Sequence, residues 1–311
     1  MTWLWFLCAA APALFHAISA MIDQYVIREH TSGSPLLFLS FSGFVCLPIA
    51  VIIALFIPVF DGITAMQAGW IITAALLFSA CCIPYVYAME DADAHEITPV
   101  FQTSPIFVAV FGWIFLGETL TIYQMIGGVI VIIAAAASMI DFKHFKFKAR
   151  PFFLILLGMI FYAAFVMVLR PVAIDRHWLQ LTFWMCVGWT LVPVFISVLF
   201  PDIRRVLVSK LIATRGRVIL YSSGQEIADV AANATRAAAL GFAAIPAAVT
   251  DLVGGLQVVF ALMVSFVAAR IIPSIYQFDL SWRAVIYKLG CFVVMMVGLM
   301  MVIMPGGGHG G

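Results

Sequence analysis

Charged residues are scarce in this chain of 311 residues, because Asp, Glu, Lys and Arg together make up only 10% of it. Hydrophobic residues make up 65%, and the mean hydropathy is +1.13. A soluble domain of this length could not cover so much apolar surface with groups that water solvates. We therefore predict an integral membrane protein.

Sequence patterns that carry chemistry are also missing. There is no nucleophile–base set, no metal-ligand spacing and no glycine-rich phosphate loop, which argues against an enzyme, a metal, any other cofactor and an ATP-driven pump. Lys and Arg do not alternate with aromatic residues as in nucleic-acid-binding proteins, and the N-terminus lacks the basic region of a cleavable signal peptide. The cysteines all fall in apolar segments and are expected to be small buried hydrophobes: Cys8, Cys46, Cys81, Cys82, Cys186 and Cys291.

What the chain does contain is a series of long apolar segments. Each has about the 20 residues that a helix needs to cross the hydrocarbon core. Turn residues separate them, as at Gly33–Pro35. The pattern predicts an all-α fold with ten transmembrane helices. The predicted spans are residues 3–27, 36–60, 68–89, 97–116, 122–140, 152–172, 178–200, 218–240, 244–270 and 284–304.

Similar residues recur at a nearly constant distance along the chain. Pro48 and Pro193 lie 145 positions apart in the second and seventh segments, and Pro99 and Pro246 lie 147 apart in the fourth and ninth. This predicts two five-helix repeats, and an odd number of spans in each half makes their orientations opposite, as in many secondary transporters. The predicted divisions are residues 1–140, a basic linker at 141–150, residues 151–304 and a flexible glycine-rich tail at 305–311.

The distribution of Lys and Arg predicts the orientation in the membrane. With ten spans, 13 of the 16 basic residues fall on one side, and Arg170, Arg176 and Arg236 fall on the other. The excess marks the cytoplasmic side, so both termini are expected outside the cytoplasm, in a bacterial inner membrane. The acidic run Glu90–Glu96 is expected to be a solvated connection on the cytoplasmic side.

The end of the fourth segment resembles the EamA-like branch of the drug/metabolite transporter superfamily. In that family the fourth helix closes in Leu-Gly-Glu before a short turn into the fifth, as in Leu116-Gly117-Glu118 followed by Gln124–Gly128. The second half has Val267–Arg270 at the corresponding place and lacks this turn. The resemblance implies a ten-helix carrier with a central cavity and alternating access, and it implies no particular substrate.

The same turn carries residues with an expected structural role. Gly117 ends the fourth helix, and Thr121 with Gln124 matches a capping box that opens the fifth. Glu118 places a carboxylate near the positive N-terminal end of that helix.

Four polar residues share one face of the eighth segment. Glu226, Asp229, Asn233 and Arg236 recur at steps of three and four, which places them on one side of a helix. A charge at bilayer depth costs several kcal/mol, so such groups face a partner or a cavity. This face is the leading candidate for a functional site.

Arg236 and Asp251 are predicted to form a structural ion pair. The two lie about equally far from the turn between the eighth and ninth segments, so they fall at similar depth on antiparallel neighbours. Alternatively, Arg236 receives a substrate anion.

Glu226 and Asp229 lie one turn apart near the middle of their segment. Two carboxylates in a low dielectric repel each other, so at least one should hold a proton at neutral pH. Such a pair can exchange a proton for a cationic group, and the alternative is a hydrogen-bonded pair that locks helices together.

Other polar residues are weaker candidates. His16 and Asp23 share a face of the first segment, where His16 facing Asp23 can relay protons. Gln102 in the fourth segment is a candidate cavity residue, because Pro105 loosens that helix nearby.

We therefore predict a secondary active transporter, namely a proton-linked exporter of a small polar, amine-containing metabolite that acts as a monomer or homodimer. Its partners are the substrate, protons and the lipid bilayer. One alternative is a carrier or flippase of anionic nucleotide- or lipid-linked sugars, and another is a membrane sensor or enzyme.

Overall fold

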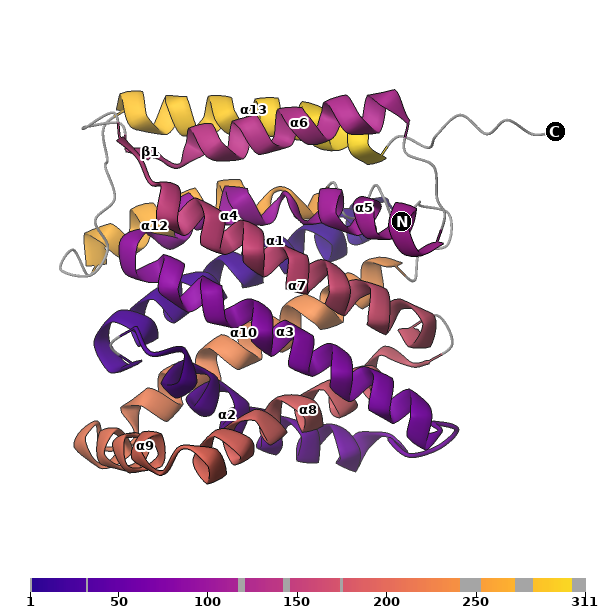
Figure 1. Ribbon diagram of the computed structural model, residues 1–311, viewed down its shortest axis with the longest axis vertical. Coiled ribbons are helices and arrows are strands. Elements are labelled where there is room, and N and C mark those ends of the chain that lie inside the picture. The colour runs from indigo at the N-terminus through magenta and orange to yellow at the C-terminus, as the bar shows by residue number, and fades with distance from the viewer. Residues whose placement is uncertain are drawn as a thin grey trace.

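In the residues that it describes, the computed structural model consists of helices and their connections, with one β-ribbon of two short strands (Figure 1). It describes residues 2–31, 33–116, 121–141, 146–173, 176–240, 253–271 and 282–303.

The elements of the first half begin with a long helix that ends in a short π-helix. They are α1 (Thr2–Val26), the π-helix (Ile27–Thr31), α2 (Pro35–Phe56), α3 (Ala65–Asp91), α4 (Ala94–Phe101), α5 (Ser104–Leu116) and α6 (Ile122–Ser138). The remaining elements are β1 (Ile140–Asp141), β2 (Lys146–Phe147), α7 (Ala149–Ala173), α8 (Trp178–Leu199), α9 (Pro201–Ala213), α10 (Arg217–Leu240), α12 (Gln257–Ile271) and α13 (Trp282–Ile303).

Six helical segments among the described residues are long and apolar enough to cross a membrane: α2, α3, α4 with α5, α7, α8 and α13. The apolar helices α6 and α12 are shorter, at 17 and 15 residues. Helices α1 and α10 have 25 and 24 residues, and α10 includes the polar face predicted above. The chain is a multi-pass integral membrane protein, and ten spans stay a prediction.

Helix starts follow local capping signals. Thr64 and Gln67 form a capping box at α3, and Thr121 and Gln124 form another at α6. In each, the threonine hydroxyl accepts from a backbone N–H and the glutamine side chain accepts in return, so two unpaired donors are satisfied.

Two connections differ from the predicted pattern. The fourth predicted span breaks at Gln102 and Thr103, whose N–H groups bond to the carbonyls of Pro99 and Val100 in tighter turns. Pro105, which has no N–H, causes the break by removing the next helical hydrogen bond. Residues 201–213, which lie between the seventh and eighth predicted spans, form helix α9, and the predicted linker at 141–150 includes β2 and the end of β1.

The most extensive helix contacts join the two halves of the chain. They are α1 with α10, α2 with α8, α3 with α7, and α6 with α13. Figure 1 shows α6 and α13 along one edge, α2 and α8 along the opposite edge, and α1, α3, α7 and α10 between them. Neither half therefore packs as a separate unit.

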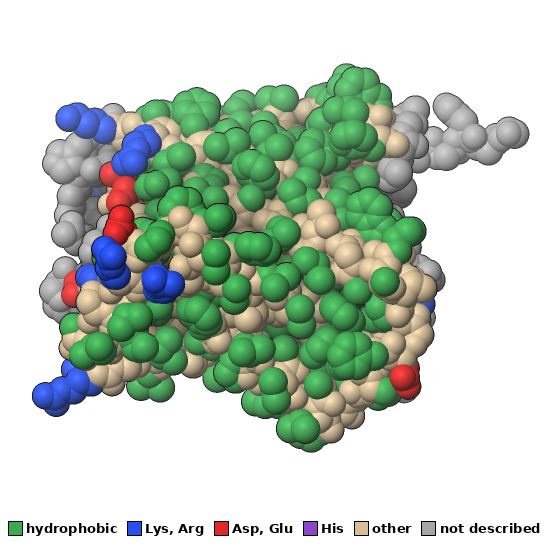
Figure 2. Space-filling view, turned by 60° about the horizontal axis from the view of Figure 1, so that its bottom comes forward, with side chains coloured by type: hydrophobic (Ala, Val, Ile, Leu, Met, Phe, Trp, Pro, Cys, Tyr) green, Lys and Arg blue, Asp and Glu red, His purple; other side chains and the backbone are tan. Residues whose placement is uncertain are grey.

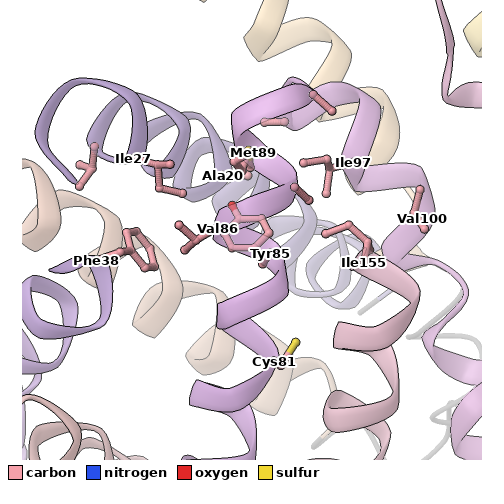
Figure 3. Close-up of a cluster of buried hydrophobic side chains, with 14 of the residues drawn as sticks. Ala20, Ile27, Phe38, Cys81, Tyr85, Val86, Met89, Ile97, Val100 and Ile155 are labelled. Atoms are coloured by element: carbon pink, nitrogen blue, oxygen red, sulfur yellow. The ribbon is translucent and has the colours of Figure 1, made fainter. Parts of the chain in front are cut away.

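The largest apolar core lies where α1, α2, α3, α4 and α7 meet (Figure 3). Phe38, Val86, Met89, Ile97 and Ile155 are among its buried side chains. This core fixes the positions of α1 and α3, which carry part of the candidate site.

Helices α6 and α13 approach each other through glycine. A Cβ atom added at Gly127 would lie 2.6 Å from the carbonyl oxygen of Gly298, and one at Gly298 would lie 2.8 Å from that of Gly127. Real Cβ atoms do not come this close to backbone, so both positions need glycine for this contact.

We expect Gly127→Ala to lower the free energy of unfolding by about 1–3 kcal/mol, because the added methyl group forces the two helices apart. Gly128→Ala is the matched control, since its Cβ would meet only Ile106, at 3.5 Å. Thermal unfolding in detergent measures both variants. Equal effects of the two substitutions would contradict the close contact.

Candidate substrate and proton site

Helix α10 has an outward and an inward face. Leu220 and Ile227 are strongly exposed and lie on one side of the helix, whereas Gln225 and Glu226 are buried. At 100° per residue, Asp229 lies opposite Ile227, on the same side as the buried pair. Glu226 and Asp229, the described half of the predicted polar face, thus lie on the side that α10 turns toward the other helices.

Glu226 is the most enclosed carboxylate of this face, and α2 supplies its hydrogen-bond donors. The Ser42 hydroxyl donates to Glu226 Oε1, and the Cys46 thiol donates to Oε2 over 3.5 Å. The same Ser42 hydroxyl lies 3.1 Å from Gln225 Oε1. Glu226 therefore sits in a small polar site between α2 and α10.

Asp229 contacts a histidine of α1. His16 Nδ1 lies 3.1 Å from Asp229 Oδ1, and Gln225 Nε2 donates to Oδ2 over 3.0 Å. The two side chains of the His16–Asp229 pair are 26% and 29% exposed.

Asp23 is the third carboxylate, and it does not contact His16 as the sequence suggested. Instead the Tyr85 hydroxyl of α3 donates to Asp23 Oδ2 over 2.9 Å. Its other oxygen, Oδ1, is buried and has no hydrogen-bond partner in the part of the chain described here. Asp23 interacts electrostatically with Asp229 and Glu226, so carboxylates from α1 and α10 converge.

A second polar network lies near the α3–α4 connection. Arg28 Nη1 lies 2.8 Å from Asp93 Oδ1, and Gln24 Nε2 donates to the same oxygen over 2.8 Å. Burial raises the pKa of the Asp93 carboxyl, and the Arg28 charge opposes that rise. The Gln24 amide oxygen accepts from the backbone N–H of Ala94, which ties α1 to the start of α4.

The expectation that the whole run Glu90–Glu96 is solvated is wrong. Glu96 is buried, with Lys148 Nζ 2.6 Å from Oε2 and Lys288 Nζ 3.8 Å from Oε1. Only the start of the run is on the surface, where Asp91 pairs with Arg150. Basic residues from distant segments make burial of the second part possible.

Comparisons with known proteins agree with the predicted class. Residues 3–140 match the EamA-like transporter family, which is part of the drug/metabolite transporter superfamily. The match covers less than half of the chain, so it shows a likeness of the first half to that transporter family. The comparison with curated protein sequences finds no match.

A solved crystal structure of a protein shares the fold. It is 14% identical in sequence, with a TM-score of 0.50, and the match covers 92% of this chain and 95% of that one. At this identity the likeness speaks for the fold alone. It extends beyond the EamA-like segment into the second half of the chain.

The EamA-like segment supplies only part of the carboxylate cluster. His16, Asp23 and Tyr85 lie within it, whereas Glu226 and Asp229 lie outside. Gln102 lies at the α4–α5 break and is not among the residues that contact the cluster. Several predicted residues fall outside the description, as whole residues or as side chains: Gly117, Glu118, Asn233, Arg236 and Asp251.

Sequence reasoning missed the groups that hold the carboxylates. Ser42 and Cys46 are small residues one turn apart on an apolar helix, and Tyr85 is one aromatic among many. Nothing local distinguishes them from packing residues. Within the described residues no three His, Cys, Asp or Glu side chains are arranged to hold a metal ion.

We expect Tyr85→Phe to lower the free energy of unfolding by about 1–3 kcal/mol, because it removes the hydrogen-bond donor of a buried carboxyl group. Tyr87→Phe is the control, since Tyr87 lies on the exposed side of the same helix. Thermal unfolding of both variants in detergent tests this. A neutral Tyr85→Phe would mean that Asp23 does not depend on the hydroxyl.

Lys148→Gln should cost about 1.5–3 kcal/mol, since it removes a charged partner of the buried Glu96. Lys146→Gln is the matched control two residues earlier, where the side chain is exposed. Chemical unfolding in mixed micelles measures the difference. If both variants unfold like the unmodified protein, the buried pair contributes no stability.

Proposed function

We propose that this protein is a secondary active transporter that exports a small polar, amine-containing metabolite in exchange for protons. The observation that carries the proposal is the convergence of Asp23, Glu226 and Asp229 with His16 between α1 and α10. Groups that gain and lose charge inside a membrane are typical of proton and cation pathways.

The exchange of protons for an ammonium group follows from the high electrostatic energy of the carboxylates when nothing is bound to them. Several carboxylates in a low dielectric are unfavourable when they are all ionised and unpaired. Protons or an ammonium group each remove this cost, and they compete for the same oxygens. The site therefore changes between the two sides while loaded with one or the other, which couples their movements.

Glu226 and Asp229 would divide this work. Glu226 is enclosed by Ser42 and Cys46 and suits a proton that is shielded from water. Asp229 is partly exposed and paired with His16, so it is the group that an incoming ammonium reaches first. His16 can take up the proton that Asp229 releases.

The contact pattern supports two inverted five-helix halves, residues 1–140 and 151–304. In this arrangement α1, α2, α3 and α6 of the first half correspond to α7, α8, α10 and α13 of the second. If the halves are related by symmetry, the contact between α1 and α10 must have a counterpart between α7 and α3, and the contact between α3 and α8 must have one between α10 and α2. All four pairs are in contact. Transporters with such symmetry bind their substrate between the halves, near the middle of the membrane.

The charge distribution supports an orientation with both termini outside the cytoplasm of a bacterial inner membrane. Lys and Arg gather along one edge of the molecule in Figure 2, and Figure 1 shows that α1 begins and α13 ends toward the opposite side. The basic edge is then the cytoplasmic one.

Glu226→Gln and Asp229→Asn should each lower proton-driven amine transport at least tenfold, roughly the effect of losing one hydrogen bond to a charged group. Purified protein in liposomes, an imposed pH gradient and a panel of labelled amines and amino acids measure this. Asp61→Asn is the control, because this carboxylate is exposed on the α2–α3 turn.

Transport of anionic sugar compounds would contradict the proposal. Its signature is activity that survives Glu226→Gln and is lost in Arg236→Ala. A rate of amine transport that does not change with the imposed pH gradient would contradict proton coupling.

A further inference from the structure

A separate cavity of about 320 Å³ lies at the basic end of the molecule, away from the carboxylate cluster. It is lined by the end of α1, the π-helix and the turn between α9 and α10, including Tyr25, His30, Arg215, Arg217 and Tyr221. Its volume is in the range of about 300–1,000 Å³ that is usual for small-molecule sites.

Three rings form one wall of this cavity. His30 stacks on Tyr221 with ring centroids 5.7 Å apart, and Tyr25 meets Tyr221 edge-on at 4.8 Å. His30 Nε2 is buried and has no hydrogen-bond partner among the residues described. Burial lowers the pKa of His30, which favours the neutral ring. A ligand in the cavity could form a hydrogen bond with Nε2.

The lining of the cavity is also strongly basic. Arg215 and Arg217 are among its lining residues, and Lys210 is close enough to act on His30 electrostatically. Glu29 is the acidic group that acts on the same ring. The excess of guanidinium groups favours an anion, and guanidinium geometry suits the oxygens of a phosphate.

Arg215 is held in a conformation that disfavours any side chain. Its φ is 50°, in the left-handed region, and Gly216 follows at 77°. Glycine would occupy such a position at lower cost, so an arginine there is retained at the expense of stability. Arg215 is one of the residues that line the cavity, so a role in binding there would explain why this position is not glycine.

Exposed apolar side chains flank the cavity. Ile212 in α9 is 72% exposed and Leu220 in α10 is 68% exposed. Helix α9 also exposes Val208 and the basic residues Arg204 and Arg205. Apolar and basic side chains together on a short helix are typical of a membrane surface.

We propose that this cavity binds the phosphate group of an anionic phospholipid, with the headgroup between Arg215 and Arg217 and the acyl chains over Ile212 and Leu220. A soluble phosphate compound offers the same phosphate group, but it has no acyl chains to pack against the exposed apolar residues Ile212 and Leu220. The proposal does not depend on what the protein transports.

The test uses the whole protein, purified in a neutral detergent. Dioctanoyl phosphatidylglycerol should raise the melting temperature in a concentration-dependent way, because it binds only the folded state. Dioctanoyl phosphatidylcholine at the same concentrations should have a much smaller effect. An equal shift with glycerol 3-phosphate would overturn the assignment to a lipid.

Arg215→Gly separates binding from stability. Without lipid its melting temperature should be unchanged or higher, because glycine relieves the left-handed conformation. Its affinity for the anionic lipid should fall about tenfold, as for the loss of a charge-assisted contact. Arg204→Ala is the control for general surface charge, since Arg204 is exposed on α9 outside the cavity.

Equal loss of affinity in Arg204→Ala and Arg215→Gly would overturn the proposal, because it would show diffuse attraction to the basic surface. Full lipid affinity in Arg215→Gly would overturn it as well.

Discussion

The contact between α1 and α10 is the interaction on which the rest of the account depends. It joins the first helix of the EamA-like segment to a helix more than 200 residues later, and His16 meets Asp229 across it. Asp23 and Glu226 are buried on either side of the same contact, where a lone charge would be costly. Their hydrogen bonds to Tyr85 and Ser42 bring α3 and α2 into the arrangement, so packing and chemistry share the same residues.

Helix α1 and the π-helix after it also carry the second polar network, through Gln24 and Arg28. Arg28 and Gln24 hold Asp93 at the start of α4, and Lys148 at the start of α7 holds Glu96 in the same region. These contacts tie helices of both halves together at the basic end. The alternating access that we propose would require these ion pairs to separate, and solvation of the freed charges would offset much of their loss. The two networks are thus linked through one helix.

The sequence predicted helices better than it predicted partners. The spacing of Glu226 and Asp229 identified the inward face of α10, because the position of a face depends only on helical periodicity. The partner of His16 was mistaken, since it depends on the angle between α1 and α10, which no local pattern encodes. The prediction that Glu96 is solvated was wrong for the same reason, because its partner Lys148 is 52 residues away in the sequence. Helix α9 was missed because a short basic stretch looks like a connection until it has a surface to pack against.

The central claim is that Glu226 and Asp229 exchange protons for an ammonium group. Infrared difference spectroscopy of the reconstituted protein tests it most directly, because a protonated carboxyl group has its own C=O stretching band. The account predicts a band that titrates with pH, weakens when a transported amine is added, and is lost or altered in Glu226→Gln and Asp229→Asn. A titrating band that is identical in both variants, or no response to the amine, would contradict it.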